Sequence, residues 1–140
     1  MRQKSVLLVC RDNAFLSQFA EAYINGRSAT DLRAFSAGLE PGERVSPKLK
    51  RMLDKTGLSA EGLHPKSWQI FAQPFAPDLD QVICFDKPTG VAMEAAFPGR
   101  VVRSYKAYLS SLAQSSPSDD RSVAALSGLL QMTDLIMQDC

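Results

Sequence analysis

The stretch VLLVCRDNAFLSQFAEAYIN, residues 6–25, decides the fold and contains the most informative loop of the chain. Residues 5–9 are apolar on both faces, which is typical of a strand at the centre of a parallel sheet. From Ser17 onward, apolar residues recur at helical spacing: Phe19, Ala20, Tyr23 and Ile24. Residues 25–26, Asn-Gly, then provide a helix stop. The stretch therefore predicts a strand, a short polar loop that begins at Cys10, and an amphipathic helix.

The loop between this strand and this helix would wrap its backbone N–H groups around one point, which makes an anion cradle. Helix N-termini offer unpaired donors and a positive dipole end, and both lower the pKa of a thiol placed there. Cys10 is then a candidate thiolate. Alternatively, Cys10 is only a small buried side chain at a strand end, which is the commoner role of an isolated cysteine. Taken alone, the loop leaves both interpretations open.

The rest of the chain alternates strand and helix patterns. Strands are predicted at residues 32–37, at 80–85 and around 101–102, and helices at 47–56, at about 89–96 and at 123–137. The helix after Ser46 has the clearest punctuation, with Ser46 as N-cap, Pro47 in the first turn and Gly57 as stop. Residues 68–71 fit a brief helix or a strand, and the following loop contains two prolines. This alternation predicts a parallel sheet covered on both faces.

Size and composition favour one domain spanning residues 1–140. The formal net charge is +1 with both signs interspersed, so neither nucleic acid nor a membrane surface is an expected partner. No signal pattern or bilayer-length apolar segment is present, and we expect a soluble cytoplasmic protein. Cys10, Cys84 and Cys140 form no C-x-x-C pair and His64 is the only histidine, so we expect no metal site, no cofactor and no disulfide framework.

A resemblance to a known family starts in the loop. Cys10, Asn13 and Ser17, followed by AEA at residues 20–22, resemble the low-molecular-weight protein tyrosine phosphatases and their arsenate reductase relatives, whose loop reads C-x-x-x-x-x-R-S. Residues 34–68 look like the S-A-G turn and second helix of that family, with HPKS close to the reductase branch. DQVICFD, residues 80–86, is similar to the phosphatase strand that leads into an acidic residue. The resemblance covers about the first two thirds of the chain.

This resemblance implies a fold and a set of roles. The implied fold is an α/β, flavodoxin-like three-layer sandwich with a central four-stranded parallel sheet, as in phosphotyrosine protein phosphatase I. Cys10 would be the nucleophile, Asn13 would help to fix the loop, and Ser17 would assist the thiolate. The implied phosphate-binding loop consists of Arg11, Asp12, Asn13, Ala14, Phe15 and Leu16.

Two departures from the family pattern remove catalytic groups. Leu16 stands where the family has its arginine, and a transition-state arginine is worth on the order of a thousandfold or more in phosphoryl transfer. The family's general acid is an aspartate before a proline, and the chain contains no Asp-Pro pair. Asp119 and Asp120 lie where the last helix should begin. A missing acid costs roughly another hundredfold to ten-thousandfold.

Other departures concern recognition and rescue. Residues 39–42 offer no aromatic border for phosphotyrosine, and residues 87–99 lack the relay cysteines of the reductases, while Cys84 should point elsewhere. Arg11 could supply a substitute charge, but Asp12 beside it would offset much of that charge. Lys87 has a weaker claim to the same role.

Three functions remain open at this stage. The first is an impaired or inactive pseudophosphatase that binds a phosphate-like anion or a phosphorylated partner. The second is an active phosphatase that works through a Cys10 phosphoenzyme with atypical rescue residues, with an arsenate-reductase-like protein as a weaker version. The third is a non-catalytic interaction protein, for which the last helix offers a homodimer contact.

Overall fold

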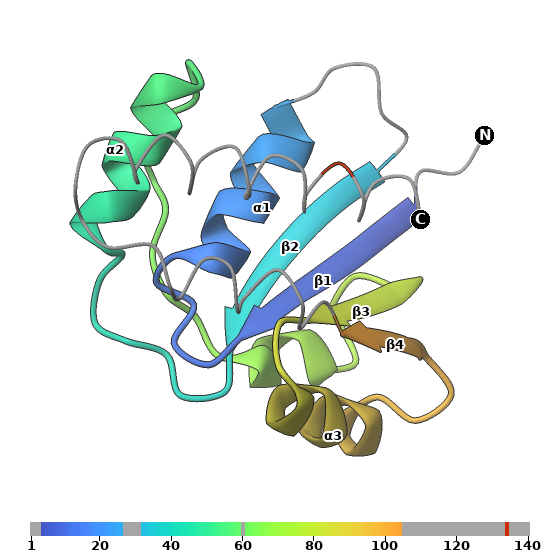
Figure 1. Ribbon diagram of the computed structural model, residues 1–140. Helices are drawn as coiled ribbons and strands as arrows, with labels where there is room; N and C mark the ends of the chain where they lie inside the picture. Colours follow the sequence, from blue (N-terminus) through green and yellow to red (C-terminus); the bar gives the residue numbers. More distant parts are fainter. Residues whose placement is uncertain (1–3, 27–31, 60, 105–133, 135–140) are drawn as a thin grey trace.

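The computed structural model describes residues 4–26, 32–59, 61–104 and 134 (Figure 1). Along these residues the elements are β1 (Lys4–Cys10), α1 (Leu16–Gly26), β2 (Leu32–Gly38), α2 (Pro47–Lys55), the 3-10 helix η1 (Trp68–Ala72), β3 (Gln81–Cys84), α3 (Lys87–Ala96) and β4 (Val101–Ser104). The predicted alternation of strands and helices is confirmed. The predicted last helix and the residues Asp119 and Asp120 lie outside the described residues, apart from Asp134.

The four strands form one parallel sheet in the order β2-β1-β3-β4, as predicted. Cys10, at the end of β1, pairs with Gly38 of β2, and Val9 pairs with Cys84 of β3. The chain moves from β1 outward to β2 and from β3 outward to β4. The strand order therefore reverses between β1 and β3, and the carboxyl ends of strands at such a point form the usual ligand crevice of open α/β sheets. Cys10 lies at this crevice.

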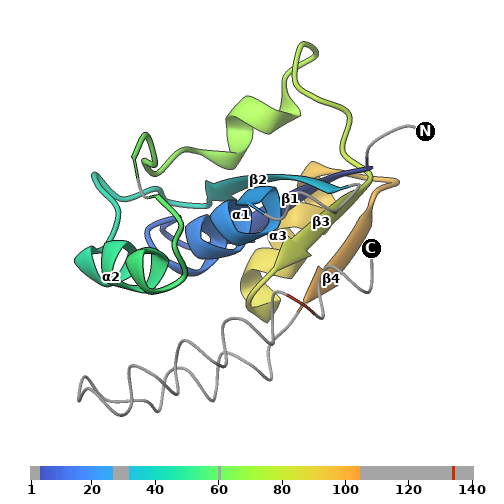
Figure 2. The same ribbon diagram turned by 90° about the horizontal axis from the view of Figure 1, so that it is seen from above.

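Alternating side chains of the central strands supply two separate cores. Val6, Leu8 and Cys10 of β1 face α1 and α2, whereas Leu7 and Val9 face α3 and η1. Figure 2 shows α1 and α2 on one side of the sheet and the η1 segment on the other. Because both faces are covered, residues 6–10 of β1 are apolar and buried, and only Lys4 and Ser5 at the start of the strand are polar. The predicted three-layer architecture is confirmed.

The helix ends agree with the sequence signals in one case and correct them in another. Ser46 Oγ accepts the N–H of Lys48 at 3.2 Å, and Gly57 has a φ of 74°, so α2 begins and stops as predicted. The predicted start of α3 near residue 89 is wrong, because the helix begins two residues earlier, at Lys87. Asp86 caps it there: its Oδ1 accepts the N–H of Thr89 at 2.7 Å. None of the described helices combines the length and apolar character needed to cross a membrane.

Candidate functional site

The loop between β1 and α1 is held by the segment that follows β2. Four backbone hydrogen bonds connect the two segments. The N–H of Leu39 donates to the carbonyl of Cys10 at 3.3 Å, and that of Glu40 to Arg11 at 2.8 Å. The N–H of Gly42 donates to the carbonyl of Asp12 at 3.0 Å, and that of Ser46 to Ala14 at 2.9 Å. In a trans peptide the N–H of one residue points opposite to the carbonyl of the residue before it. The amides that follow these carbonyls therefore point away from residues 39–46, and the N–H groups of Asn13 and Ser17 act on the Cys10 thiol. Amides that converge on one point in this way are what an anion cradle requires.

Cys10 lies at the bottom of the loop and is only 6 % exposed. Its Sγ is 2.8 Å from Ser17 Oγ, and the backbone N–H groups of Ser17 and Asn13 also act on the thiol. Burial is the largest influence and raises the pKa of Cys10, while these hydrogen bonds lower it and the charge of Asp12 raises it further. The balance is a raised pKa, which favours the neutral thiol over the thiolate.

Asn13 connects the loop to Ser17 and to the segment that contains Lys66. It is buried and has a φ of 54°, a left-handed conformation that asparagine tolerates better than most residues. Its Oδ1 accepts the backbone N–H of Lys66 at 2.9 Å, so its Nδ2 must face Ser17, to which it donates at 2.8 Å. Ser17 Oγ therefore accepts from Asn13, and it makes a second hydrogen bond with Cys10 Sγ in which either atom can be the donor.

Two further residues that support the loop were not singled out by the sequence analysis. Gln18 is fully buried, and its Nε2 donates to Asn13 Oδ1 at 3.1 Å and to the carbonyl of His64 at 2.7 Å. Lys66 contributes its backbone N–H to Asn13 and its carbonyl to the N–H of Gly38 at 2.8 Å. Because Lys66 is 53 residues from Asn13, only the folded chain reveals this contact. The HPKS resemblance was the one available signal.

Leu16 and Phe15 end the loop as apolar residues. Leu16 is the first residue of α1, and its half-buried side chain packs against the core between the sheet and α1. Phe15 packs against the same core, and Lys48 Nζ lies 5.3 Å from the centre of its ring. The position where the family arginine would stand is therefore occupied by a hydrocarbon side chain that packs against the core.

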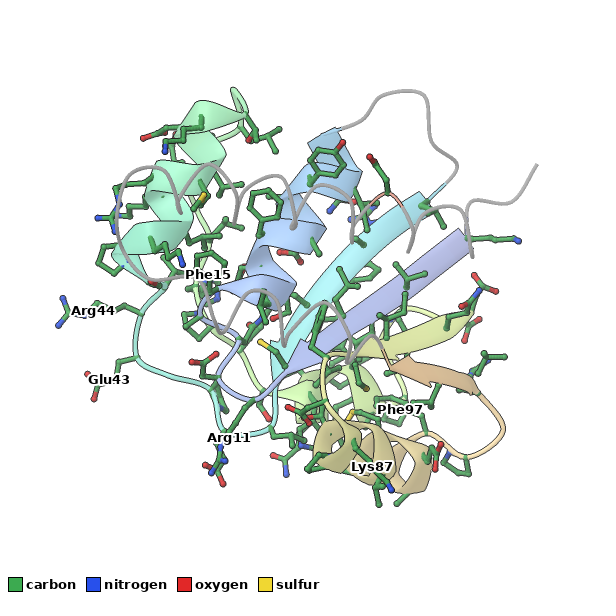
Figure 3. The ribbon with its side chains drawn as sticks, in the orientation of Figure 1. Arg11, Phe15, Glu43, Arg44, Lys87 and Phe97 are labelled. Atoms are coloured by element: carbon green, nitrogen blue, oxygen red, sulfur yellow. The ribbon has the colours of Figure 1, made fainter. Side chains whose placement is uncertain are left out.

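The two charged residues of the loop take different directions. Arg11 Nη2 is 3.6 Å from Glu40 Oε2, both side chains are more than three-quarters exposed, and Arg11 extends outward from the loop in Figure 3. Asp12 instead bends inward: its Oδ1 accepts the N–H of Ala14 at 3.1 Å and lies 3.8 Å from Cys10 Sγ. Of these two charged groups, the Asp12 carboxylate is the one that lies near the Cys10 thiol, and the Arg11 guanidinium is not.

Cys84 is separated from this site by the sheet. It belongs to the core that faces α3, whereas Cys10 belongs to the core that faces α1. Burial raises the pKa of Cys84 to about 12, and neither Cys10 nor Cys84 is in a disulfide. The expectation that Cys84 points away from the loop agrees with this arrangement. Lys87 is exposed at the start of α3.

Comparisons with known proteins place these features in context. The family model described as low molecular weight phosphotyrosine protein phosphatase matches residues 5–116. No curated protein matches the chain significantly.

Several solved structures share the fold. An arsenate reductase in the phosphate binding state is 20% identical, with a TM-score of 0.71 and coverage of 97% of this chain and 98% of its own. A YwlE mutant from Bacillus subtilis is 16% identical, with a TM-score of 0.73 and coverage of 97% of each chain. The tyrosine phosphatase Wzb from Escherichia coli K30, in complex with sulphate, is 16% identical, with a TM-score of 0.72 and coverage of 97% of each chain.

Proposed function

The chain belongs to the low molecular weight phosphotyrosine protein phosphatase family, and we propose that it is a pseudophosphatase: it holds a phosphate-like anion in its loop without turning over phosphate esters. The ligand is free phosphate or the phosphoryl group of a phosphorylated partner in the cytoplasm. The observation that carries the proposal is the combination of Cys10, still contacted by the N–H groups of Asn13 and Ser17, with Leu16 packed against the core.

The missing arginine is the strongest argument against turnover. A guanidinium binds two phosphoryl oxygens at once and stabilises the transition-state charge, and a leucine can do neither. Arg11 does not support a rescue, because its guanidinium is paired with Glu40 on the surface. On the order of a thousandfold or more in rate is lost with such an arginine.

The state of the nucleophile argues in the same direction. Thiolates attack phosphorus, whereas thiols do not, and burial raises the pKa of Cys10. In the family an arginine would help to hold this thiolate, and here that help is absent. A chain without an Asp-Pro pair also lacks the acid that protonates the leaving group, at a cost of roughly a hundredfold or more.

The retained loop supports anion binding. Its carbonyls are tied to residues 39–46, so its amides are preorganised around Cys10 before any ligand arrives. Two solved structures with this fold are described as binding phosphate and as a complex with sulphate. Arsenate reduction is not supported, because Cys84 lies on the opposite face of the sheet from Cys10.

Hydrolysis of a small aryl phosphate by the purified protein tests the absence of turnover. The natural chain and Cys10→Ser are assayed side by side under reducing conditions, with product release followed by absorbance. We expect equal rates, at the level of the buffer. Turnover by the natural chain that disappears in Cys10→Ser would contradict the proposal and would favour an active phosphatase with an atypical rescue residue.

A further inference from the structure

The carboxylate of Asp12 occupies a specific place within the loop. Its Oδ1 is 3.1 Å from the nitrogen of Ala14 and 3.8 Å from Cys10 Sγ. The first contact occupies the backbone N–H of Ala14 within the loop. In the second, the carboxylate oxygen accepts from the thiol on which the N–H groups of Asn13 and Ser17 also act. A negatively charged oxygen of the protein itself is therefore held within the loop by the N–H of Ala14 and the thiol of Cys10.

These two distances define the position that one oxygen of a bound oxyanion would take. An anion centred above the sulfur must bring its oxygens within hydrogen-bond reach of the loop amides and into van der Waals contact with the sulfur. Asp12 Oδ1 satisfies both conditions. Two negatively charged oxygens cannot share this position, because electrostatic repulsion opposes them and a single N–H cannot serve both at full strength.

We propose that Asp12 is the specificity-determining residue of the loop: its carboxylate takes the place of one oxyanion oxygen, so a tetrahedral oxyanion binds only after this side chain has swung out. The inference rests on the proposed function, because it assumes that the loop is an anion site. Asp12 is exposed, so its side chain can rotate into solvent without disturbing the core. The bonds of the Asp12 carbonyl to Gly42 and of Asn13 to Lys66 do not depend on the carboxylate.

Leu16 increases the effect of the Asp12 charge on phosphate binding. An arginine at the end of the loop would attract a phosphate and compete for the carboxylate of Asp12, whereas leucine leaves the negative charge of Asp12 without a counter-charge at that position. A phosphate bound beside the Asp12 carboxylate would be repelled strongly, because two like charges in contact near a protein surface interact strongly, although solvent and salt screen an exposed group. We therefore expect removal of the carboxylate to raise phosphate affinity by roughly tenfold or more.

The test measures binding of inorganic phosphate by calorimetry to the full chain at pH 8, at low salt. Asp12→Ala removes the carboxylate, and Asp12→Asn removes only its charge while keeping an oxygen that can accept from Ala14. Both are made in the natural chain and in Leu16→Arg. Glu43→Gln is the matched control, because Glu43 is an exposed carboxylate of the adjacent segment that extends outward in Figure 3. It changes the net charge by the same amount as Asp12→Asn.

The expected result is a gain of roughly tenfold or more for Asp12→Ala in the natural chain and a smaller gain in Leu16→Arg, where the arginine offsets the charge of Asp12. Asp12→Asn should give a smaller gain than Asp12→Ala, and Glu43→Gln a change within about twofold. An equal gain for Glu43→Gln would overturn the inference, since the effect would then be one of overall charge. If Leu16→Arg binds phosphate but Asp12→Ala raises the affinity in neither background, the inference fails while the anion site stands. If the folded double variant, Asp12→Ala with Leu16→Arg, binds no phosphate, both fail together.

Discussion

At position 10, burial and hydrogen bonding act on the thiol in opposite directions. Burial dominates and raises the pKa of Cys10 above its ordinary value of 9.0, despite the donors from Ser17 and Asn13. Because the folded-state pKa is raised, ionisation of Cys10 weakens folding, and the thiolate appears only as the pH rises through that value. A loop built to activate a nucleophile would show the opposite shift.

We therefore predict that Cys10 reacts more slowly with iodoacetamide at pH 7.5 than a free thiol does. The pH profile of alkylation should rise only above about pH 9. The measurement uses Cys140→Ser as background and Cys10→Ser in that background as the blank, and Cys84, whose pKa is raised to about 12, should not contribute. A profile that rises below pH 7 would show an activated thiolate and contradict this interpretation.

The left-handed Asn13 shows how far single-residue reasoning extends. The resemblance assigned Asn13 to loop fixation, and the structure gives it three hydrogen-bond partners, Ser17, Gln18 and Lys66. Lys66, the partner that lies beyond α1, could not be predicted, because this contact depends on which later segment returns to the loop. The inward turn of Asp12 was not predicted either, since the sequence suggested only that Asp12 offsets the charge of Arg11.

At the scale of elements, the junction of β1 with β2 sets the shape of the loop. Gly38 pairs with Cys10, and a Cβ added to Gly38 would lie 3.0 Å from the carbonyl oxygen of Arg11 and from the carbonyl carbon of Asp12. Both are backbone atoms that cannot rotate away. The S-A-G turn therefore keeps its glycine because the loop backbone passes directly over it.

Gly38→Ala should lower the free energy of unfolding by about 1–3 kcal/mol, the usual cost of forcing atoms into a packed site. Urea denaturation measures this loss. Gly42→Ala is the matched control in the same segment, because an added Cβ there would have its nearest neighbours at 3.9 Å. Equal stability of the two variants would contradict the account of how β2 shapes the loop.

Elements with strong local signals were predicted well from the sequence. Ser46 with Pro47 marks the start of α2, and the apolar run of β1 marks a central strand, because capping and two-faced burial act on adjacent residues. The start of α3 was misplaced, because Asp86 was interpreted as a family acidic residue instead of a cap. The η1 segment stayed ambiguous, since five residues are too few for periodicity to distinguish a helix from a strand.

At the scale of the whole molecule, one ion pair joins three parts of the chain. Lys66 Nζ lies 3.8 Å from Glu21 Oε1 of α1 and donates to Ser36 Oγ of β2 at 3.2 Å. The two charged side chains are 21% and 13% exposed. Burial raises the pKa of Glu21, against the lowering effect of Lys66, and burial lowers the pKa of Lys66. Lys66 also bonds Asn13 of the loop through its backbone N–H, so the pair and the loop share one residue.

Lys66→Met should reveal this burial through a pH-dependent loss of stability. Without Lys66 the pKa of Glu21 rises further. A carboxyl group whose pKa is raised by folding stabilises the fold fully below its unfolded-state pKa, which is about 4.5 for Glu21. This stabilisation is lost as the pH rises through the folded-state pKa. The loss relative to the natural chain should thus be small near pH 4.5 and reach about 1–3 kcal/mol at pH 7.

Urea denaturation at both pH values measures this difference, and Glu21→Gln added to Lys66→Met should restore most of the stability at pH 7. The double variant removes the buried carboxylate together with its lost partner. A loss of equal size at both pH values would indicate that Lys66 acts by packing alone, and would contradict the electrostatic explanation.

The central claim, that the chain keeps the loop of its family but has lost phosphoryl transfer to Cys10, is tested most directly by a single-turnover experiment. The natural chain, in excess over a small aryl phosphate, is mixed rapidly with it, and release of the aryl alcohol is followed beside Cys10→Ser. Transfer to Cys10 would release the alcohol even if the phosphoenzyme were never hydrolysed. The account predicts no release above that of Cys10→Ser, and release that requires Cys10 would contradict it.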